Sequence, residues 1–274
     1  MAKSTRDRLR WSGTLPDPRA TPGVGSKEEA AKQVQRVAAK LAVEQEKLFA
    51  NGKLGGGQRV LLLLQGMDAS GKDGTVKHVV GLVNPAGCRI TSFGKPTPEE
   101  LSHDFLWRIT NALPAAGQLG VFNRSQYEDV LVVRVHELVP RSGWSRRFAR
   151  INTWERKLAD SGTTLVKVFL HISKEEQKER LLARLVDPTK HWKVGTHDFA
   201  ERQRWDDYQA AYLDVLEKCS TDVAPWYVVP ADRKWYRDWA VSQLLLEAMR
   251  DLDLRWPVPE GLDLKALTAE LKAE

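Results

Sequence analysis

The chain has 274 residues, 42% of them hydrophobic and 28% charged, so it can bury a full core and is neither a disordered nor a fibrous chain. The net charge of +6 indicates a polyanionic partner, and the two cysteines form no CxxC pair and no disulfide framework. No stretch has the roughly 18 apolar residues of a membrane span, and the basic start of the chain lacks the apolar segment of a signal peptide. We therefore expect a cytoplasmic protein that does not bind membranes.

Helices and strands are predicted to alternate along the chain. Residues 1–26, rich in proline, glycine and arginine, are predicted to form an N-terminal arm, and residues 27–274 a single domain. Short apolar runs predict five strands, at 59–65, 88–93, 119–124, 163–172 and 224–231. Helical spacing and capping signals predict helices at 27–50, 72–83, 98–113 and 234–252, and one more after the capping box of Ser173 and Glu176. This alternation indicates an α/β fold with a parallel five-stranded sheet flanked by helices, in which ligands bind at the carboxyl ends of the strands.

A glycine-rich loop follows the first predicted strand and precedes a helix. The sequence GMDASGKDGT, residues 66–75, contains the G-x-x-x-x-G-K pattern through Gly66, Gly71 and Lys72. In such a loop the backbone N–H groups and the helix N-terminus converge on phosphate oxygens, and the lysine adds a positive charge. A plain glycine turn is the alternative, but the strand–loop–helix context favours phosphate binding. The predicted phosphate-binding residues of the loop are Gly66, Ala69, Ser70, Gly71, Lys72, Asp73, Gly74 and Thr75.

Two carboxylates distinguish this loop from an ordinary Walker A sequence. Asp73 occupies the position after the lysine, where Ser or Thr usually ligates Mg²⁺, and Asp68 lies inside the loop itself. A carboxylate within a phosphate-binding loop repels a phosphate chain unless a cation lies between them. We therefore expect Asp68 to bind Mg²⁺, directly or through water. The alternative is that Asp68 caps the loop backbone as an Asx turn.

A second group of charged residues follows the third predicted strand. Arg124 comes just past the strand end, where it can bind a phosphate, and Glu128 and Asp129 follow closely. One of the two carboxylates would complete the metal site with Asp68 or accept a proton from the attacking group. Phosphoryl transfer depends mainly on positioning and charge neutralisation, so little base catalysis is needed. The alternative is an acidic pair at a helix start, favoured by the helix dipole.

A basic helical lid is predicted at about 180–206. Arg180, Arg184, Lys190 and Lys193 oppose only Asp187, a net charge of +3 over 180–193. Such a flap can close on phosphates and exclude water, which matters because hydrolysis competes with transfer. A solvated charged helix is the alternative. A second basic stretch, 141–157, carries a net charge of +5 and could extend a polyanion track, or be a solvated or subunit-contact face.

Six blocks of sequence together resemble the polyphosphate kinase 2 family over residues 27–250. They are GMDASGKDGT, FNRSQYEDVLVVRVH, FLHISKEEQKERL, DPTKHWK, RWDDYQAAY and APWYVVPADRKWYR. The resemblance implies a thymidylate-kinase-like P-loop fold with a helical lid, and reversible, Mg²⁺-dependent transfer of phosphate between inorganic polyphosphate and AMP, ADP or ATP, with Mn²⁺ as an alternative metal. It also implies a homo-oligomer, dimer or tetramer, that has no nucleic acid partner.

The resemblance carries roles to matching positions. Asp68 and Lys72 match the catalytic pair of the loop, and Arg124 matches the arginine of the family's Asp-Arg-Ser element. Asn123 replaces the aspartate of that element, and Asp129 is placed to substitute for it. This version looks like the third class of the family, which accepts both AMP and ADP. The predicted catalytic residues are Asp68, Lys72, Arg124, Asp129 and Arg184, and the predicted metal ligands are Asp68 and Asp129. The predicted lid contacts to phosphate are Arg180, Arg184, Lys190 and Lys193. The predicted nucleotide contacts are Asn123, Arg124, Glu128, Lys95 and Arg108.

Two other functions compete with this one. An ATP-dependent nucleoside-monophosphate kinase would use the same loop, but Asp73 and the basic lid count against it. A polyanion- or RNA-binding protein with a degenerate loop would show salt-sensitive binding without turnover, and no RNA-binding signature supports it.

Overall fold

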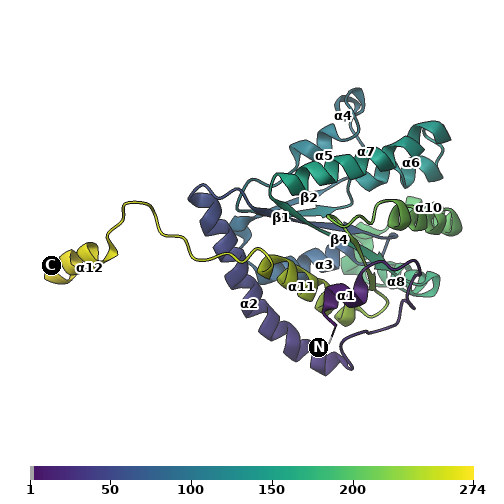
Figure 1. Ribbon diagram of the computed structural model, residues 1–274. Coiled ribbons are helices and arrows are strands. Elements are labelled where there is room, and N and C mark those ends of the chain that lie inside the picture. Colours follow the sequence, from purple (N-terminus) through teal and green to yellow (C-terminus); the bar gives the residue numbers. More distant parts are fainter. Residues whose placement is uncertain (1–2) are drawn as a thin grey trace.

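The computed structural model describes residues 3–274, in which five strands form one all-parallel sheet (Figure 1). The strands are β1 (Arg59–Gln65), β2 (Cys88–Ser92), β3 (Leu119–Asn123), β4 (Thr163–His171) and β5 (Trp226–Pro230), in the order β2-β3-β1-β4-β5. The predicted parallel five-stranded sheet is thus confirmed. The central strand β1 is apolar from Val60 to Leu64 because helices cover both of its faces, and the side chains of these residues are fully buried.

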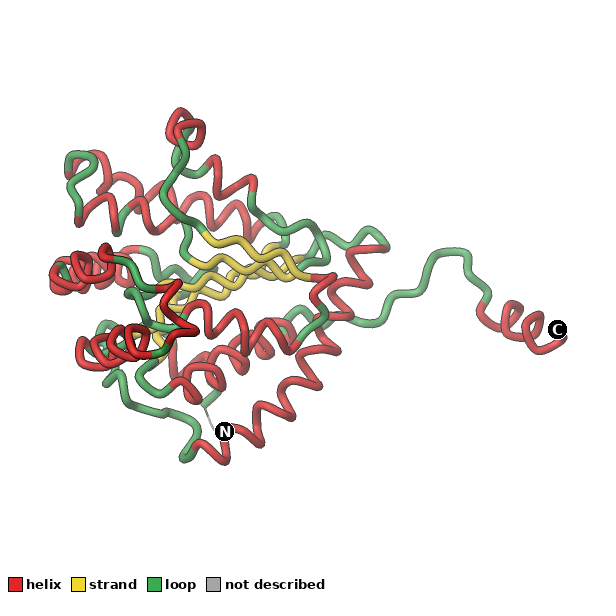
Figure 2. Tube along the Cα trace, turned by 180° about the vertical axis from the view of Figure 1, so that it is seen from behind, coloured by secondary structure: helices red, strands yellow, loops and turns green. Residues whose placement is uncertain are grey.

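Helices lie on both sides of this sheet (Figures 1 and 2). One face carries α2 (Lys27–Lys53), α3 (Lys72–Val79) and α11 (Lys234–Arg250), and the other carries α5 (Trp107–Asn111), α6 (Val132–Val135) and α7 (Arg141–Asp160). The remaining α-helices are α1 (Thr5–Leu9), α4 (Pro98–Ser102), α8 (Lys174–Val186), α9 (Thr196–Gln203), α10 (Trp205–Lys218) and α12 (Leu264–Ala273). Short 3₁₀ turns are η1 (Val80–Leu82), η2 (Pro85–Gly87), η3 (Gln126–Asp129) and η4 (Pro188–Lys193).

The register of the sheet brings the carboxyl ends of its central strands level with one another. Leu64 of β1 pairs with Asn123 of β3, and Gln65 pairs with Phe169 of β4. The glycine loop after β1, Arg124 after β3 and the turn after β4 therefore meet at one edge. This is the edge at which parallel α/β sheets bind ligands.

The helix predicted over 98–113 is two short helices, α4 and α5, separated by residues 103–106. The break has a local cause at Asp104. Its carboxylate accepts a hydrogen bond from the backbone N–H of Leu106 at 3.1 Å and pairs with Arg150 at 2.6 Å. Side-chain capping of this kind competes with helical hydrogen bonding and turns the chain. The helix predicted over 72–83 likewise ends at Val79 and continues as η1 to Leu82.

The described part of the N-terminal arm packs along α11 and the edge strand β5. Leu9 and Val24 are buried in the core. The carboxylate of Glu247 accepts hydrogen bonds from the backbone N–H groups of Thr5 and Arg6, and the N–H of Trp11 donates to the carbonyl of Trp226. These contacts hold the described part of the arm against the body. The boundary between an N-terminal arm, residues 1–26, and a single domain, residues 27–274, stays a prediction. In residues 3–274 no helix combines the length and apolarity that crossing a bilayer requires.

Candidate active site

A cavity of about 870 Å³ opens at the carboxyl edge of the sheet. Its walls come from the glycine loop, the ends of β2 and β3, helix α8, the lid and the start of α11. Eight lysines and arginines line it against five aspartates and glutamates, so the cavity favours an anionic ligand. The predicted residues that line it are Asp68, Ala69, Gly71, Lys72, Asp73, Gly74, Asn123, Arg124, Arg180, Arg184, Lys190 and Lys193.

The glycines of the loop are required by close packing. Gly71 has φ of +106°, and a Cβ there would lie 1.9 Å from Nη1 of Arg237. Gly66 has φ of +153°, and a Cβ there would lie 2.7 Å from the carbonyl oxygen of Leu170. Only glycine tolerates both the positive φ and the contact. The loop therefore holds the tight path that leads β1 into the N-terminus of α3, where backbone N–H groups are available to phosphate oxygens.

Lys72 lies at the floor of the cavity, 8% exposed. Its ammonium group donates to the carbonyls of Gly66 at 2.6 Å and Met67 at 3.2 Å. Burial lowers the pKa of Lys72, and the nearby carboxylate of Asp68 opposes that shift. A desolvated ammonium group gains more from an anion than an exposed one does, because fewer water contacts are lost on binding.

Arg124 joins the end of β3 to the glycine loop. Its Nη2 donates to Oδ1 of Asp68 at 2.9 Å, and its Nη1 lies 4.0 Å from a carboxylate oxygen of Glu128. Burial alone would lower the pKa of Arg124, but Glu128 and Asp68 raise it above its usual value. The backbone of Arg124 has φ of +65°, an uncommon conformation for a non-glycine residue that often marks a functional site.

Asp73 links the loop to the lid. Its Oδ1 accepts from Nδ2 of Asn123 at 2.9 Å, and its Oδ2 accepts from Nζ of Lys193 at 2.8 Å. These hydrogen bonds lower the pKa of Asp73, against the effect of its partial burial. The carboxylate that replaces the usual Ser or Thr thus holds one lid lysine directly over the phosphate-binding loop.

The two lid arginines have different contacts. Arg184 pairs with Asp198 of α9 at 3.2 Å and lines the cavity. The guanidinium N–H groups of Arg180 are largely used in hydrogen bonds within the protein. They donate to the backbone carbonyls of residues 69, 70, 231 and 232 and to the carboxylate of Glu176. Arg180 therefore holds the glycine loop against the end of β5, and it has less capacity to bind a phosphate than Arg184 has.

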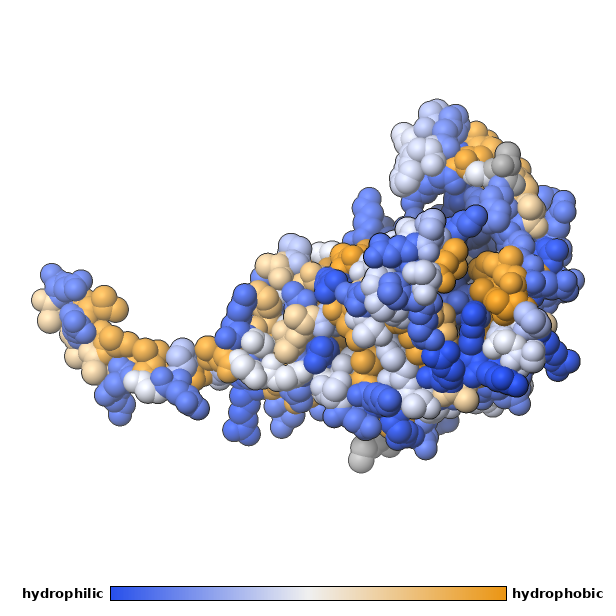
Figure 3. All heavy atoms as spheres, turned by 90° about the horizontal axis from the view of Figure 1, so that it is seen from above, coloured by the Kyte–Doolittle hydropathy of each residue, from blue (hydrophilic) through white to orange (hydrophobic). Residues whose placement is uncertain are grey.

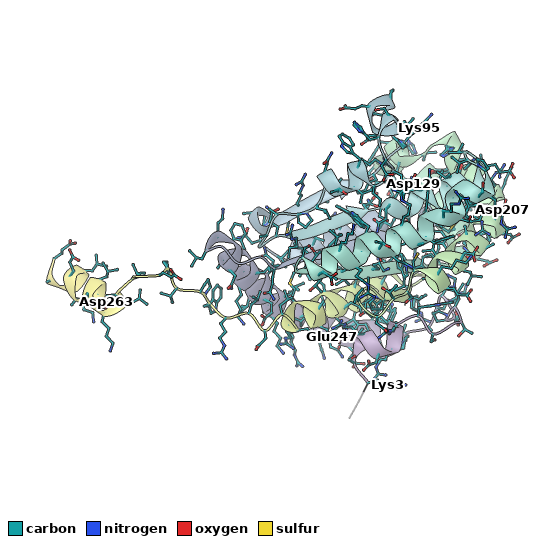
Figure 4. The ribbon with its side chains drawn as sticks, turned by 45° about the horizontal axis from the view of Figure 1, so that its top comes forward. Lys3, Lys95, Asp129, Asp207, Glu247 and Asp263 are labelled. Carbon is teal, nitrogen blue, oxygen red and sulfur yellow. The ribbon has the colours of Figure 1, made fainter. Side chains whose placement is uncertain are left out.

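Several predicted site residues do not line the cavity. Gly66, Ser70 and Thr75 belong to the loop but do not line the cavity, and Glu128 reaches the site only through Arg124. Lys95 is exposed on the segment before α4, which projects from the body (Figure 4). Arg108 is buried over the ring of Phe93, with its guanidinium carbon 5.5 Å from the ring centre, and Phe93 itself lines the cavity.

Asp129 faces away from Asp68. Nη1 of Arg147 donates both to its Oδ1 and to its backbone carbonyl at 2.9 Å. Burial raises the pKa of Asp129 to about 6, although Arg147 and Arg108 act in the opposite direction. The 3₁₀ turn η3 directs Glu128 toward Arg124 and Asp129 toward α7. The structure thus brings Asp68, Lys72, Arg124 and Arg184 together at the cavity and leaves Asp129 outside it.

Sequence reasoning missed nine residues that line the cavity, among them the basic side chains of His78, Lys234 and Arg237. Lys234 and Arg237 begin α11, which follows β5 at the same edge of the sheet. Burial and the positive charge of Arg180 lower the pKa of Lys234. The available signal was the position of this helix start after a strand, since such starts lie beside the ligand in parallel sheets.

A parallel sheet with a lysine-bearing glycine loop at its carboxyl edge, under a lid that carries arginines and lysines, defines a P-loop phosphotransferase. The model of the polyphosphate kinase 2 family matches residues 25–256, and the chain belongs to that family.

Named relatives agree with this assignment. The AMP/ADP-polyphosphate phosphotransferase of Meiothermus ruber is 48% identical over 236 residues, which cover 86% of this chain and 87% of the relative. The ADP-polyphosphate phosphotransferase of Rhodopseudomonas palustris is 44% identical over 244 residues, covering 85% and 83%. A crystal structure of polyphosphate kinase 2 from Arthrobacter aurescens TC1 is 51% identical, covers 100% of this chain and 98% of its own, and superposes with a TM-score of 0.96. The resemblance and the predicted P-loop fold are therefore confirmed.

Proposed function

We propose that this protein transfers a phosphoryl group reversibly between inorganic polyphosphate and AMP or ADP, forming ADP and ATP. The observation that carries the proposal is the cation-rich cavity built around Lys72 and Arg124 at the end of the sheet. Relatives named for polyphosphate phosphotransfer to AMP and ADP support it. The predicted third class, which accepts both nucleotides, is part of this proposal.

The two substrates enter from opposite sides of the glycine loop in this proposal. Ser92, Phe93 and Asn123, at the ends of β2 and β3, form the acceptor side. On the other side lie the basic residues Lys190, Lys234 and Arg237, beside α8 and the start of α11. A polyphosphate chain carries negative charge along its whole length. Several cations side by side can therefore contact several of its phosphates, whereas a single terminal phosphate would use only one or two of them.

The reaction needs no strong base. An anionic oxygen of the nucleotide phosphate attacks the terminal phosphorus of polyphosphate, a new P–O bond forms, and the bond to the rest of the chain breaks. The shortened chain leaves with the bonding electron pair. Arg124 would orient the acceptor phosphate, while Lys72, Arg184 and Lys193 would bind the transferred group and exclude water.

We further propose that the site uses Mg²⁺, or Mn²⁺ in its place, with Asp68 as its protein ligand. The carboxylate of Asp68 pairs with Arg124 through Oδ1, whereas Oδ2 accepts no hydrogen bond from residues 3–274, and Asp68 lines the cavity. A carboxylate oxygen of this kind suits a hard divalent cation. Asp129 fits less well as the second ligand, because it would have to leave Arg147. The metal would neutralise negative charge on the phosphate oxygens.

A donor comparison tests the function. The protein is incubated with AMP and Mg²⁺, supplied with either polyphosphate or ATP, and the experiment is repeated with ADP as the acceptor. We expect ADP and then ATP to form from polyphosphate. Rapid formation of ADP from ATP, with none from polyphosphate, would instead establish an ATP-dependent nucleoside-monophosphate kinase. Salt-sensitive polyphosphate binding without turnover would leave only a polyanion-binding role.

The cytoplasmic location and the homo-oligomeric state stay predictions. Cys88 and Cys219 are both free thiols in the structure, which fits a reducing compartment. The basic stretch 141–157 lies within α7, where Arg147 and Arg150 pair with Asp129 and Asp104. These pairs support a structural role for part of that stretch.

A further inference from the structure

The lid helix α9 buries a carboxylate instead of an apolar side chain. The helix spans Thr196–Gln203, and among residues 197–203 only Glu201 is buried, with its side chain 7% exposed. Phe199 of this helix is 42% exposed, and Trp192 in the preceding turn η4 is 78% exposed. The right-hand side of Figure 3, where α8 and α10 also lie, is largely hydrophilic. Apolar packing therefore contributes little to holding α9 in place.

Two side chains from outside the lid meet that carboxylate. Nε2 of His136, the residue that follows α6, lies 2.9 Å from Oε1 and 3.0 Å from Oε2 of Glu201. The hydroxyl of Tyr208, on α10, donates a hydrogen bond to Oε2. Burial and the hydrogen bond to Glu201 raise the pKa of Tyr208, so the phenol stays protonated and remains a donor. A buried carboxylate costs free energy unless it is paired, so these two partners make the buried position of Glu201 favourable.

A further hydrogen bond joins the end of the lid to the end of α6. Nη1 of Arg204, the residue that follows α9, donates to the carbonyl of Val135, which directly precedes His136. A second histidine, His197, approaches Oε1 of Glu201 only to 3.3 Å and is 76% exposed, so solvent screens this contact. The connection of α9 to the rest of the protein thus depends on the end of α6, and its buried charged contact is the one with His136.

The same helix also carries a residue of the cavity. Asp198, three positions before Glu201, pairs with Arg184 at 3.2 Å, and both Asp198 and Arg184 line the cavity. A shift of α9 that broke the contact with His136 would carry Asp198 away from Arg184. It would also move η4, which directly precedes α9 and carries the cavity residue Lys193. The position of the lid cations is therefore coupled to the contact between His136 and Glu201.

We propose that His136 and Glu201 form a latch that keeps the lid closed over the cavity during phosphoryl transfer, and this rests on the proposed function. Both are positioning residues, because neither lines the cavity. Arg180 already fixes the first part of the lid through its hydrogen bonds to the glycine loop and to the end of β5. The latch fixes the opposite end, so Lys193 between them is held over the loop. A closed lid binds polyphosphate and excludes water, so the latch should affect both polyphosphate binding and hydrolysis.

Steady-state kinetics test the latch through its effect on substrate use. His136→Ala removes the contact, whereas His136→Gln places an amide N–H near the former position of Nε2. Initial rates of ADP formation are measured over a series of polyphosphate concentrations at saturating AMP, together with the release of inorganic phosphate. We expect His136→Ala to raise the KM for polyphosphate by about tenfold, because a hydrogen bond to a charged group is lost. We expect a smaller change in kcat, more inorganic phosphate for each ADP formed, and recovery of most of the difference in His136→Gln.

The matched control is His197→Ala, which removes the exposed histidine near the same carboxylate. It should change each value by less than about twofold, since exposed ion pairs contribute little. The proposal would be overturned if His136→Ala kept the KM for polyphosphate and the yield of inorganic phosphate of the wild type, whether or not kcat fell. A failure of His136→Gln to recover either value would also overturn it.

Hydrogen exchange tests the latch without any reaction. Full-length wild type and His136→Ala, both free of substrate, are exchanged at neutral pH, and peptides from 188–203 are compared with peptides from β1 and β4. We expect the lid peptides of the variant to exchange about tenfold faster, with the sheet unchanged, because only the lid opens more often. Equal exchange in the lid, or faster exchange throughout the chain, would overturn the proposal. If the wild type formed no ADP from polyphosphate, the proposed function would fail while this measurement still decided the latch.

Discussion

Arg124 donates a hydrogen bond from Nη2 to Oδ1 of Asp68 at 2.9 Å, across the gap between the end of β3 and the glycine loop. The two residues are 56 positions apart in the sequence, and the register of β1 and β3 brings them together. In this arrangement the guanidinium group neutralises the carboxylate inside the phosphate-binding loop. When a phosphate binds Arg124, the carboxylate needs another cation, which is the physical basis for the metal proposed at Asp68.

Replacing Asp68 with asparagine tests that metal role. Asp68→Asn keeps the shape of the side chain and its acceptor for Arg124, but removes the negative charge that a metal requires. We expect turnover to fall by about 10²-fold or more, and the Mg²⁺ concentration for half-maximal rate to rise. Initial rates measured over a Mg²⁺ series, with polyphosphate and AMP held constant, provide the measurement.

A matched control for this variant is Asp207→Asn on α10. Asp207 lies outside the cavity lining and is largely exposed (Figure 4). It should leave both turnover and Mg²⁺ dependence unchanged. If Asp68→Asn lost melting temperature and activity in parallel, Asp68 would be a structural cap of the loop, as the Asx-turn alternative holds.

Lys72 is expected to be essential for transfer. Lys72→Ala removes the one loop cation at the floor of the cavity, whose pKa is already lowered by burial. Loss of a preorganised charge at the transferred group should reduce kcat by about 10²–10³-fold. The control is Lys53→Ala, at the end of α2 beside the opposite edge of the sheet. Steady-state assays with polyphosphate and AMP would refute the loop chemistry if Lys72→Ala retained normal turnover.

The sequence predicted the sheet and the loop well because their signals are local. A continuous apolar run followed by glycines specifies a buried strand and a tight turn, as in β1 and the loop at Gly66 and Gly71. The sequence did not predict in which directions two neighbouring side chains point. Glu128 and Asp129 are adjacent, yet the turn η3 sends one to Arg124 and the other to Arg147.

Residues that depend on tertiary packing were also beyond linear reasoning. Arg180 has the sequence context of a phosphate contact, but its donors are occupied by backbone carbonyls that only folding brings near. Lys234 and Arg237 carried no motif, and they reach the cavity because α11 starts at the carboxyl edge of the sheet. Spacing along the chain predicts which residues share an element, and the contacts between elements decide their partners.

Asp129 should make stability depend on pH in a defined window. Its pKa is raised to about 6 in the folded protein from an ordinary value of 3.8, so the folded state binds more protons between these values. Stability therefore falls as pH rises from about 4 to 6, and the cost of ionisation is complete above that range. Relative to Asp129→Asn, the wild type should lose roughly 3 kcal/mol of unfolding free energy across this window.

Urea unfolding of both proteins from pH 4 to 8 measures the difference. Subtracting the unfolding free energy of the variant from that of the wild type at each pH removes the contributions of all other carboxylates, because these titrate in the same way in both proteins. A difference that stays flat over the whole range would mean that Arg147 keeps the pKa of Asp129 at its ordinary value. If the wild type instead became more stable than the variant as pH rises, the ion pair with Arg147 would affect the pKa of Asp129 more strongly than burial does.

The ion pair of Lys167 and Glu155 is the most deeply buried charge pair on the sheet face below α7. Both side chains are fully buried, Nζ lies 2.6 Å from Oε2, and Nζ also donates to the carbonyl of Cys219 at 2.6 Å. The hydroxyl of Tyr127 donates to Oε1 of Glu155 at 2.7 Å. Glu155→Gln would leave the lysine as an uncompensated buried cation, so we expect a loss of about 3–5 kcal/mol of unfolding free energy.

The double variant Glu155→Gln, Lys167→Met separates charge from packing. It removes both charges, keeps an oxygen acceptor for Tyr127 and fills the volume of the lysine chain with an apolar side chain of similar length. Its unfolding free energy in urea at neutral pH should exceed that of Glu155→Gln alone, because burying a neutral pair costs less than burying a lone cation. Since neither residue lines the cavity, the folded double variant should transfer phosphate at the wild-type rate. A double variant less stable than the single one would show that Lys167 contributes through its hydrogen bonds to Tyr127 and Cys219 more than through its charge.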